Sequence, residues 1–565
     1  MINLKKIILK FKYYKFLLVI LLIIIISLIN TFLPYIIKQT IALVKSDVVF
    51  HDIKQKLFSL VSVYLITTLI CAILEFLKST ILAKNTQDLI YDIRKTTYKR
   101  IMDFNMDTFS NMHISTLVTR MTSDISNIGE FIGRTLPMFL SSGVFLILVL
   151  IVMSFVNIYF AIIMIVSSIF LVVAVLKIGK KMAYYKKREI EITENLNDYF
   201  GETFSSIKTT HIFNIQNERR QKFIDYSSAE LSMSTKYFDS QSILTPVRSI
   251  TRYFIISLIL YLCLQGKVAN IDIGVIYLVV SYIDKFFEPL GNMLYHYEDI
   301  QKGKISMHRI DELMGTDENI ENIYQGENTE KLYGNIKFSN VSFSYSNKKS
   351  ILENVNFSIN EGERVALIGE TGAGKTTIVN LILGFYKINS GNITFDGKNI
   401  DDISLESLRK NISFIQQSPY VFNDTIKKNI VVNNENNFSD EKIIDILKLV
   451  GLYNKVTNFK NGIYEIVNEN SFSKGEKQLL AFARAIAKDT SIYIFDEPTS
   501  NIDVKNEQTI KNIISEVLKD STVIIIAHRP TTIENVDKIL KVQNKKVVVK
   551  SRKNIVHINN SEKFT

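Results

Sequence analysis

The chain has 565 residues, of which 47% are apolar and 22% are charged, with a formal net charge of +11. This length exceeds what one hydrophobic core supports, so two or three domains are expected. Much of the excess basic charge flanks apolar segments, which is typical of cytoplasmic membrane loops and argues against a nucleic-acid partner. The two cysteines, Cys71 and Cys263, lie in apolar runs and are too few for a disulfide framework or a metal site.

Residues 16–37 are free of charge and long enough to span a bilayer. The lysine-rich segment before them predicts a cytoplasmic N-terminus. A second span is predicted over 57–74. At its inner end, Glu75 and Lys78 are three residues apart, within helical pairing distance. They form either an ion pair near the interface or, through Glu75, a cavity group for cationic substrates.

The next uncharged stretch, residues 135–176, is long enough for two spans joined by a hairpin near 154–157. The uncharged runs 253–266 and 273–283 are shorter than a span, but they follow four clear spans and a short turn separates them. We therefore expect a fifth and a sixth span that carry charges on one face and line an aqueous cavity. These charged residues are Arg248, Arg252, Asp284, Lys285 and Glu288.

Two long connections, residues 78–134 and 178–247, lie on the cytoplasmic side of these six spans. Their apolar periodicity is helical, and they lack the Gly, Pro and Ser clusters of ordinary loops. We expect the helices to continue well beyond the membrane. Six spans return the chain to the cytoplasm.

A phosphate-binding loop follows the apolar strand-like run 364–368 and leads into a helical pattern. Its glycines let backbone N–H groups close around phosphate oxygens, and the helix N-terminus adds positive potential. Lys375 is predicted to reach the β- and γ-phosphates, and the Thr376 hydroxyl to bind Mg²⁺. The loop consists of Gly369, Glu370, Thr371, Gly372, Ala373, Gly374, Lys375, Thr376 and Thr377.

With these features the chain resembles an ABC exporter half-transporter over nearly its whole length. HISTLVTRMTSDIS, residues 113–126, is similar to the first coupling region of that family, with Ser115 where glycine is usual. The resemblance implies an α-helical membrane domain of six spanning helices followed by an α/β P-loop nucleotide-binding domain. It implies a transmembrane exporter domain over 1–315, a linker over 316–332 and the nucleotide-binding domain over 333–565, with ATP and Mg²⁺ as cofactors.

Further motifs occur in the order and spacing of that family. Tyr345 matches the aromatic residue that stacks on adenine, although an ordinary strand-surface tyrosine would look the same. Gln417, in FIQQSPYVF, matches the glutamine that contacts Mg²⁺ and the attacking water. His528 ends an apolar strand-like run and matches the histidine that contacts the γ-phosphate.

The run IYIFDEPTSNID, residues 492–503, is an apolar strand that ends in two carboxylates. A strand buried on both faces has this composition, and its ligands lie at its C-terminal edge. Asp496 is predicted to hold Mg²⁺ through water, and Glu497 to polarise the attacking water. Residues 500–503 match the D-loop of the family.

The signature that normally reads LSGGQ is FSKGE here, residues 472–476. Ser473 and Gly475 are retained, and the resemblance implies that they contact ATP held by the partner subunit. Glu476 would add negative charge near that nucleotide. Complete hydrolytic residues beside an altered signature favour a heterodimer with a second half-transporter over a homodimer.

The sequence therefore predicts ATP-driven export or flipping of an amphiphilic substrate (a drug, lipid or peptide) across the cytoplasmic membrane by a dimer. The nucleotide-binding domain would lie in the cytoplasm, and no nucleic acid is expected. The alternative is a non-transporting ATP-gated channel or regulatory ABC subunit. Intact Gln417, Glu497 and His528 argue against it, because a gate needs nucleotide binding but not repeated turnover.

Overall fold

The computed structural model describes residues 13–44, 50–265, 273–315, 326–329, 331–345, 350–432, 438–498, 504–527 and 536–551. The chain divides into two compact units. The first comprises 1–101 and 114–316, and the second comprises 102–113 and 317–565. The short stretch 102–113 therefore groups with the C-terminal unit, although it lies inside the first in sequence.

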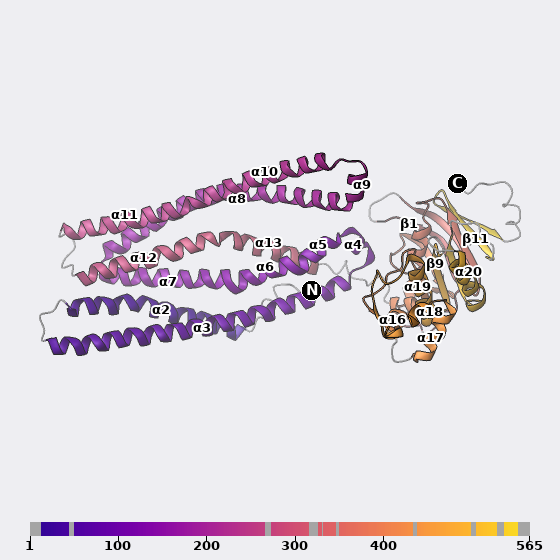
Figure 1. The fold of residues 1–565 in the computed structure, drawn as a ribbon, viewed down its shortest axis with the longest axis horizontal. Helices are drawn as coiled ribbons and strands as arrows, with labels where there is room; N and C mark the ends of the chain where they lie inside the picture. Colours follow the sequence, from indigo (N-terminus) through magenta and orange to yellow (C-terminus); the bar gives the residue numbers. More distant parts are fainter. Residues whose placement is uncertain are drawn as a thin grey trace. The chain divides into compact units, whose positions relative to one another are not determined.

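The described part of the first unit is helical (Figure 1). Long apolar helices form because a membrane leaves every backbone N–H and C=O to be satisfied within the helix itself. Its elements are α2 (Tyr13–Val44), α3 (Phe50–Met102), α5 (Ile114–Thr119), η1 (Arg120–Asp124), α6 (Ile125–Glu130), η2 (Phe131–Thr135), α7 (Leu136–Val156), α8 (Ile158–Ser205), α9 (Ile207–Ile212), α10 (Gln216–Ser242), α11 (Leu244–Leu264), α12 (Ile273–Tyr295) and α13 (Tyr297–Met314). The helices α8 and α10 run side by side, as do α2 and α7.

Five helical stretches of the described chain are long and apolar enough to cross a membrane: Lys15–Val44, Lys54–Met102, Ile114–Val156, Ile158–Ser205 and Gln216–Cys263. They contain the first four predicted spans and all but the last three residues of the fifth, 253–266. The hairpin expected near 154–157 corresponds to the break between α7 and α8 at Asn157. The side-chain oxygen of Asn157 accepts a hydrogen bond from Tyr159 N and caps the start of α8. The sixth predicted span, 273–283, lies in α12, which is not among these five stretches and combines apolar residues with Asp284, Lys285 and Glu288, so it stays a prediction. The predicted extension beyond the membrane is evident in α3 and α8, which are 53 and 48 residues long.

Three of the charged side chains on α11 and α12 contact polar protein groups. Arg252 on α11 pairs with Asp284 on α12 at 3.4 Å. The ammonium of Lys285 donates to the main-chain carbonyl of Asn30 in α2 at 2.9 Å. Pro34, inside α2, has no N–H to bond that carbonyl, four residues earlier. Lys285 therefore supplies the donor that the proline removes from α2.

A second donor from α12 reaches the same turn of α2. The buried hydroxyl of Tyr282 donates to the carbonyl of Thr31 at 2.6 Å.

At the end of the second span, Glu75 and Lys78 form an ion pair at 3.0 Å. This contact agrees with the ion-pair interpretation of the two residues.

The second unit is an α/β structure with two larger sheets. The six-stranded sheet has the order β12-β11-β3-β10-β9-β6, in which β12 is antiparallel and the other neighbours are parallel. A four-stranded antiparallel sheet has the order β2-β1-β4-β5, and β7 pairs with β8. The strands are β1 (Ile336–Phe343), β2 (Leu352–Ile359), β3 (Arg364–Gly369), β4 (Ser390–Phe395), β5 (Lys398–Asn399), β6 (Ile412–Ile415), β7 (Asp424–Thr425), β8 (Ile466–Val467), β9 (Ile492–Asp496), β10 (Thr522–Ile526), β11 (Lys538–Gln543) and β12 (Lys546–Ser551).

Helices complete this unit, and two hydrophobic clusters share the strands of the six-stranded sheet. Because β9 and β10 are buried along almost their whole length, their continuous apolar sequences fit a sheet covered on both faces. The helices are α4 (Met106–Asn111), α14 (Lys375–Ile382), η4 (Ile400–Asp402), α15 (Leu405–Lys410), α16 (Ile426–Ile430), α17 (Asp440–Leu449), α18 (Tyr453–Thr457), η6 (Gly462–Tyr464), α19 (Lys474–Lys488), α20 (Val504–Asn512) and η7 (Ile513–Val517).

The end of the expected linker is ordered against this unit. Leu332 is buried, and its N–H donates to the side-chain oxygen of Asn411 at 3.1 Å. Thr329 N donates to the Ser407 hydroxyl at 3.0 Å, and Glu327 bridges to Ile403. The polar composition of 316–332 gave no sign of these contacts.

Candidate functional site

The predicted phosphate-binding loop connects β3 to the N-terminus of α14. Gly374 precedes the helix with φ +111°, a conformation that favours glycine. Gly372 has φ +82°, and a Cβ there would meet no atom within 4 Å, so the backbone is open to an approaching ligand. Thr376 is exposed, whereas the neighbouring Thr377 is buried. This geometry suits backbone contact with phosphate oxygens.

Lys375 is buried at the base of the loop. Its ammonium donates to the carbonyls of Gly369 at 2.7 Å and Glu370 at 3.0 Å. Burial lowers the pKa of Lys375, and the negative charges of Glu497 and Asp496 oppose that shift. These two carboxylates therefore act electrostatically on the lysine that was predicted to contact phosphate.

The carboxylates lie at the end of β9, which β10 separates from β3. Ile526 of β10 is in register with both Leu367 and Asp496, so the three strands end at the same edge of the sheet. Glu497 follows directly, with φ +48° and its N–H donating to the carbonyl of Ile526 at 3.2 Å. This left-handed conformation is uncommon for glutamate and is fixed at the sheet edge.

Gln417 follows β6, the neighbour of β9. Its side-chain nitrogen donates to a carboxylate oxygen of Glu497 at 2.8 Å. The structure thus brings Lys375, Gln417, Asp496 and Glu497 to the carboxyl edge of one parallel sheet, where open α/β sheets bind ligands. His528 and residues 500–503 lie outside the described residues.

Tyr345, just after β1, is half-buried rather than freely exposed. Its hydroxyl is 3.2 Å from the hydroxyl of Thr377, and Asn380 donates to it at 3.4 Å. Its ring packs edge-on against Phe343 and Tyr386. These contacts tie the tyrosine to the helix of the phosphate-binding loop, and its predicted stacking on adenine stays a prediction.

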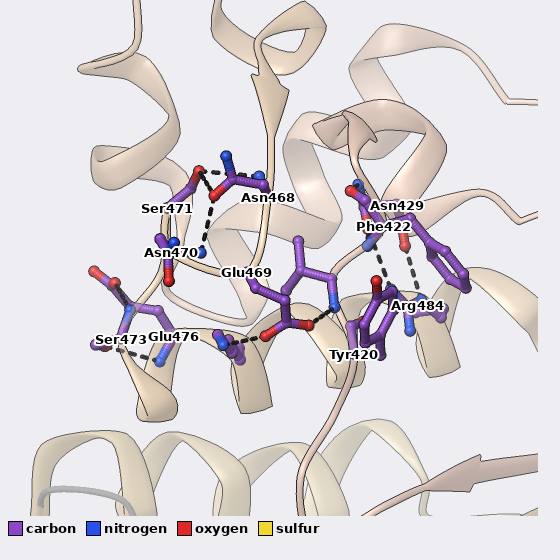
Figure 2. A network of polar contacts seen from close by, with 12 residues as sticks. Tyr420, Phe422, Asn429, Asn468, Glu469, Asn470, Ser471, Ser473, Glu476 and Arg484 are labelled. Atoms are coloured by element: carbon purple, nitrogen blue, oxygen red, sulfur yellow. Dashed lines mark hydrogen bonds and ion pairs between the residues drawn. The ribbon is translucent and has the colours of Figure 1, made fainter. Parts of the chain in front are cut away.

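The signature residues begin α19 and form a capping box (Figure 2). The Ser473 hydroxyl accepts from Glu476 N at 3.2 Å, and the Glu476 carboxylate accepts from Ser473 N at 2.8 Å. Lys455 lies 3.4 Å from the same carboxylate. Burial raises the pKa of Glu476, but the Ser473 hydrogen bonds and Lys455 outweigh it, and the net shift is downward. Glu476 therefore has a structural role within its own subunit, which the sequence interpretation missed.

The hydrogen bonds of the capping box are made within the box itself. Within the described residues, Ser473 and Gly475 make no hydrogen bond or ion pair with the phosphate-binding loop of their own chain. Contact with a nucleotide on another subunit therefore stays a prediction for these two residues.

A second polar network joins the segment after Gln417 to α19 (Figure 2). The Glu469 carboxylate accepts from Val421 N at 2.7 Å and from the Lys477 ammonium. The Arg484 guanidinium donates to the carbonyls of Asn429 at 2.8 Å and Tyr420 at 3.2 Å. None of these residues was singled out in the sequence. The available signal was Arg484, a cation within the otherwise apolar run that follows Gln478.

The residues present suit a Mg²⁺-bound nucleotide. A hydroxyl, an amide and a carboxylate, from Thr376, Gln417 and Asp496, are hard oxygen ligands of the type that Mg²⁺ prefers. No group of three or more His, Cys, Asp or Glu side chains suited to a metal occurs among the described residues. A Mg²⁺ ion that arrives with nucleotide phosphates and keeps several waters needs no such group.

Comparison with known proteins agrees with these features. A family model described as the ABC transporter transmembrane region matches residues 16–290, and one described as ABC transporter matches 352–500. The multidrug resistance-like ATP-binding protein MdlB of Buchnera aphidicola subsp. Schizaphis graminum is 28% identical over 87% of this chain and 85% of that protein. The ATP-dependent lipid A-core flippase of Pasteurella multocida is 29% identical over 83% of this chain and 81% of that protein.

A solved structure of a bacterial Atm1-family ABC exporter with ATP bound has the same fold. It superposes with a TM-score of 0.77 at 20% identity, over 99% of this chain and 97% of that chain. This likeness confirms the predicted order of a helical membrane domain and an α/β nucleotide-binding domain. The chain belongs to the ABC transporters, as a membrane-spanning half-transporter whose ATP-binding domain couples ATP hydrolysis to transport.

Proposed function

We propose that the chain exports or flips an amphiphilic substrate across the cytoplasmic membrane, as one half of a dimer with its nucleotide-binding domain in the cytoplasm. The contact between Gln417 and Glu497, beside the Lys375 loop, carries this proposal. It brings groups suited to phosphate binding and water activation to one sheet edge, on a chain that also contains membrane-spanning helices. The domains proposed are 1–315 and 333–565, joined by 316–332.

In this proposal the residues at the sheet edge divide the work of hydrolysis. The backbone of residues 369–377 and the Lys375 ammonium bind and orient the phosphates. The Glu497 carboxylate accepts a proton from the attacking water, and Gln417 fixes the orientation of that carboxylate. His528 would contact the γ-phosphate. Bound Mg²⁺ would supply charge neutralisation on the phosphates, held by Thr376, Gln417 and, through water, Asp496.

The proposed substrate class rests on the membrane domain. One relative is named for multidrug resistance and another for flipping a lipid, which support an amphiphilic substrate. The paired charges of Arg252 and Asp284 add a polar element between two largely apolar helices. Such groups at membrane depth face protein or water rather than lipid.

For the partner, we propose a second and different half-transporter. Support comes from the altered signature, in which Lys474 stands where the family has glycine. The capping box weakens one argument for this pairing, because the charge of Glu476 is held by Ser473 and Lys455 of its own chain. The composition of the signature, and not repulsion by Glu476, is therefore what favours the heterodimer.

Substrate flux tests the function directly. The purified full-length chain, alone and with a candidate partner, is reconstituted into proteoliposomes loaded with a fluorescent amphiphile. ATP-dependent vectorial flux that is lost in Glu497→Gln supports the exporter. Ion currents gated by ATP binding, retained in Glu497→Gln and without vectorial flux, would instead identify a channel or regulatory subunit.

A further inference from the structure

One face of α8 carries a continuous apolar ridge through the predicted membrane region. Ile162, Val166, Phe170 and Val173 are spaced three or four residues apart, and Ile169 lies three residues after Val166 and four before Val173, so all five share one face of the helix. Each is between 47% and 63% exposed. Exposed apolar side chains on a spanning helix fit contact with lipid chains.

The same face continues past residue 176 as a row of cations. Lys177, Lys180, Lys181 and Lys187 extend the three- and four-residue spacing, and all four are exposed. Tyr184, which is 58% exposed, lies between them on the same face. An amphipathic aromatic residue in this position suits the membrane–water interface. We call this cationic surface the α8 stripe.

The α8 stripe is not neutralised by neighbouring acidic groups. Glu189 pairs with Lys186 at 3.2 Å, and Glu191 pairs with Arg188 at 3.1 Å. Within the described part of the chain, Lys177, Lys180 and Lys187 form no ion pair. Lys181 contacts only the ring of Tyr185, at 5.9 Å. The stripe therefore keeps its positive charge for a ligand outside the protein.

The position of the stripe along the helix matches the lipid headgroups. The four residue steps from Lys177 to Lys181 cover about 6 Å at 1.5 Å per residue. The polar headgroup region of one leaflet is roughly 5–8 Å thick. Lys187 lies about 15 Å along the helix from Lys177, which is beyond that layer. The first three lysines thus span the depth at which lipid phosphates occur.

We propose that Lys177, Lys180 and Lys181 bind the phosphate headgroups of anionic lipids in the cytoplasmic leaflet. The apolar ridge contacts the acyl chains of the same lipids, and Tyr184, about 10 Å along the helix from Lys177, lies on the water side of the headgroup layer. This site is separate from the ATP site and from the charges on α11 and α12. It gives the transporter a preference for anionic over zwitterionic lipid around α8.

The test compares lipid binding to the purified full-length protein. Native mass spectrometry measures the apparent affinity for phosphatidylglycerol and phosphatidylcholine with matched acyl chains. We expect Lys177→Gln to weaken phosphatidylglycerol binding about fivefold. The triple variant K177Q/K180Q/K181Q should lose at least tenfold, with phosphatidylcholine binding unchanged. The distal Lys187→Gln change should have an effect below about twofold, because that lysine lies beyond the headgroup layer.

The matched control is K398Q/K410Q/K460Q, which removes three exposed lysines from the second unit. Phosphatidylglycerol affinity that is unchanged in K177Q/K180Q/K181Q, or that falls equally in the control, overturns the proposal. Displacement of the lipid by an equal concentration of inorganic phosphate would identify a site for free anions instead. The stripe is exposed, so the variants should stay monodisperse. If the triple variant fails to purify, the single changes at Lys177 and Lys181 decide the question.

Discussion

The side-chain nitrogen of Gln417 donates to the carboxylate of Glu497 across 2.8 Å, joining the ends of two neighbouring parallel strands. One residue follows β6 and the other follows β9. The sheet fixes both backbones, so the hydrogen bond sets how the two side chains are oriented. Replacing either side chain removes a contact that holds the other in place. The predicted water-activating carboxylate is thus positioned by the predicted Mg²⁺ ligand.

We expect Glu497→Gln to lower steady-state ATP turnover by at least about 100-fold while nucleotide binding stays near normal. Glutamine removes the proton acceptor and leaves the loop around Lys375 intact. Turnover and binding of a fluorescent ATP analogue are measured on the same preparation.

Lys375→Ala should instead weaken nucleotide binding itself, because it removes the ammonium at the base of the loop. The control for both variants is Gln416→Ala, which changes an exposed residue next to Gln417 and should stay within about twofold of wild type in both assays.

Retained ATPase in Glu497→Gln would contradict the assignment of Glu497.

Glu476→Gln separates the charge of this residue from its capping role. Glutamine also completes a capping box, so thermal stability should change little. Glu476→Ala removes the bond from Ser473 N and should lower stability by about 0.5–1.5 kcal/mol. The unfolding of both variants is followed by intrinsic tyrosine fluorescence during heating, since the chain has no tryptophan.

The two assemblies also make different predictions for ATPase activity. A heterodimer predicts low activity for the chain alone and much higher activity when the partner is co-expressed. Full substrate-stimulated activity of the purified homodimer, unaffected by Glu476→Gln, would exclude the heterodimer proposal.

A double-mutant cycle tests the contact between Lys285 and the turn of α2 that contains Pro34. Lys285→Ala leaves the Asn30 carbonyl without its donor and should cost about 1–3 kcal/mol of stability. Pro34→Ala restores a backbone N–H for that carbonyl, so Lys285→Ala should cost clearly less in this background. Unfolding in detergent gives the four stabilities, and strictly additive losses would argue against the contact.

Glu469→Gln should make stability less dependent on pH. The Lys477 ammonium and Val421 N–H hold the pKa of Glu469 below its usual value. A carboxyl with a lowered folded-state pKa stabilises the fold above its unfolded pKa, and this contribution disappears as the pH falls through the folded value. The difference in unfolding temperature between wild type and Glu469→Gln should therefore stay constant from pH 7 to about pH 5 and shrink as the pH falls from there toward about pH 3. A constant difference over this range would show that the charge of Glu469 is unimportant.

The sequence was most informative where a local pattern determines the geometry. The loop around Lys375 and the strand that ends in Asp496 depend on short-range spacing, and both lie where the pattern predicts. The contacts of Lys285 with Asn30 and of Glu469 with Val421 join residues far apart in the chain, and no local pattern encodes them. Glu476 shows a different difficulty, because the same glutamate fits a family motif and a helix cap, and only the hydrogen bonds distinguish these roles.

The length of α3 has a mechanical consequence. Its 53 residues form one helix without an internal proline and extend for roughly 80 Å. At that length, a change in tilt of a few degrees at one end displaces the other end by several ångströms. Only three residues separate α3 from α4, which groups with the nucleotide-binding unit. A helix of this kind transmits a change in tilt along its whole length, including the predicted second span.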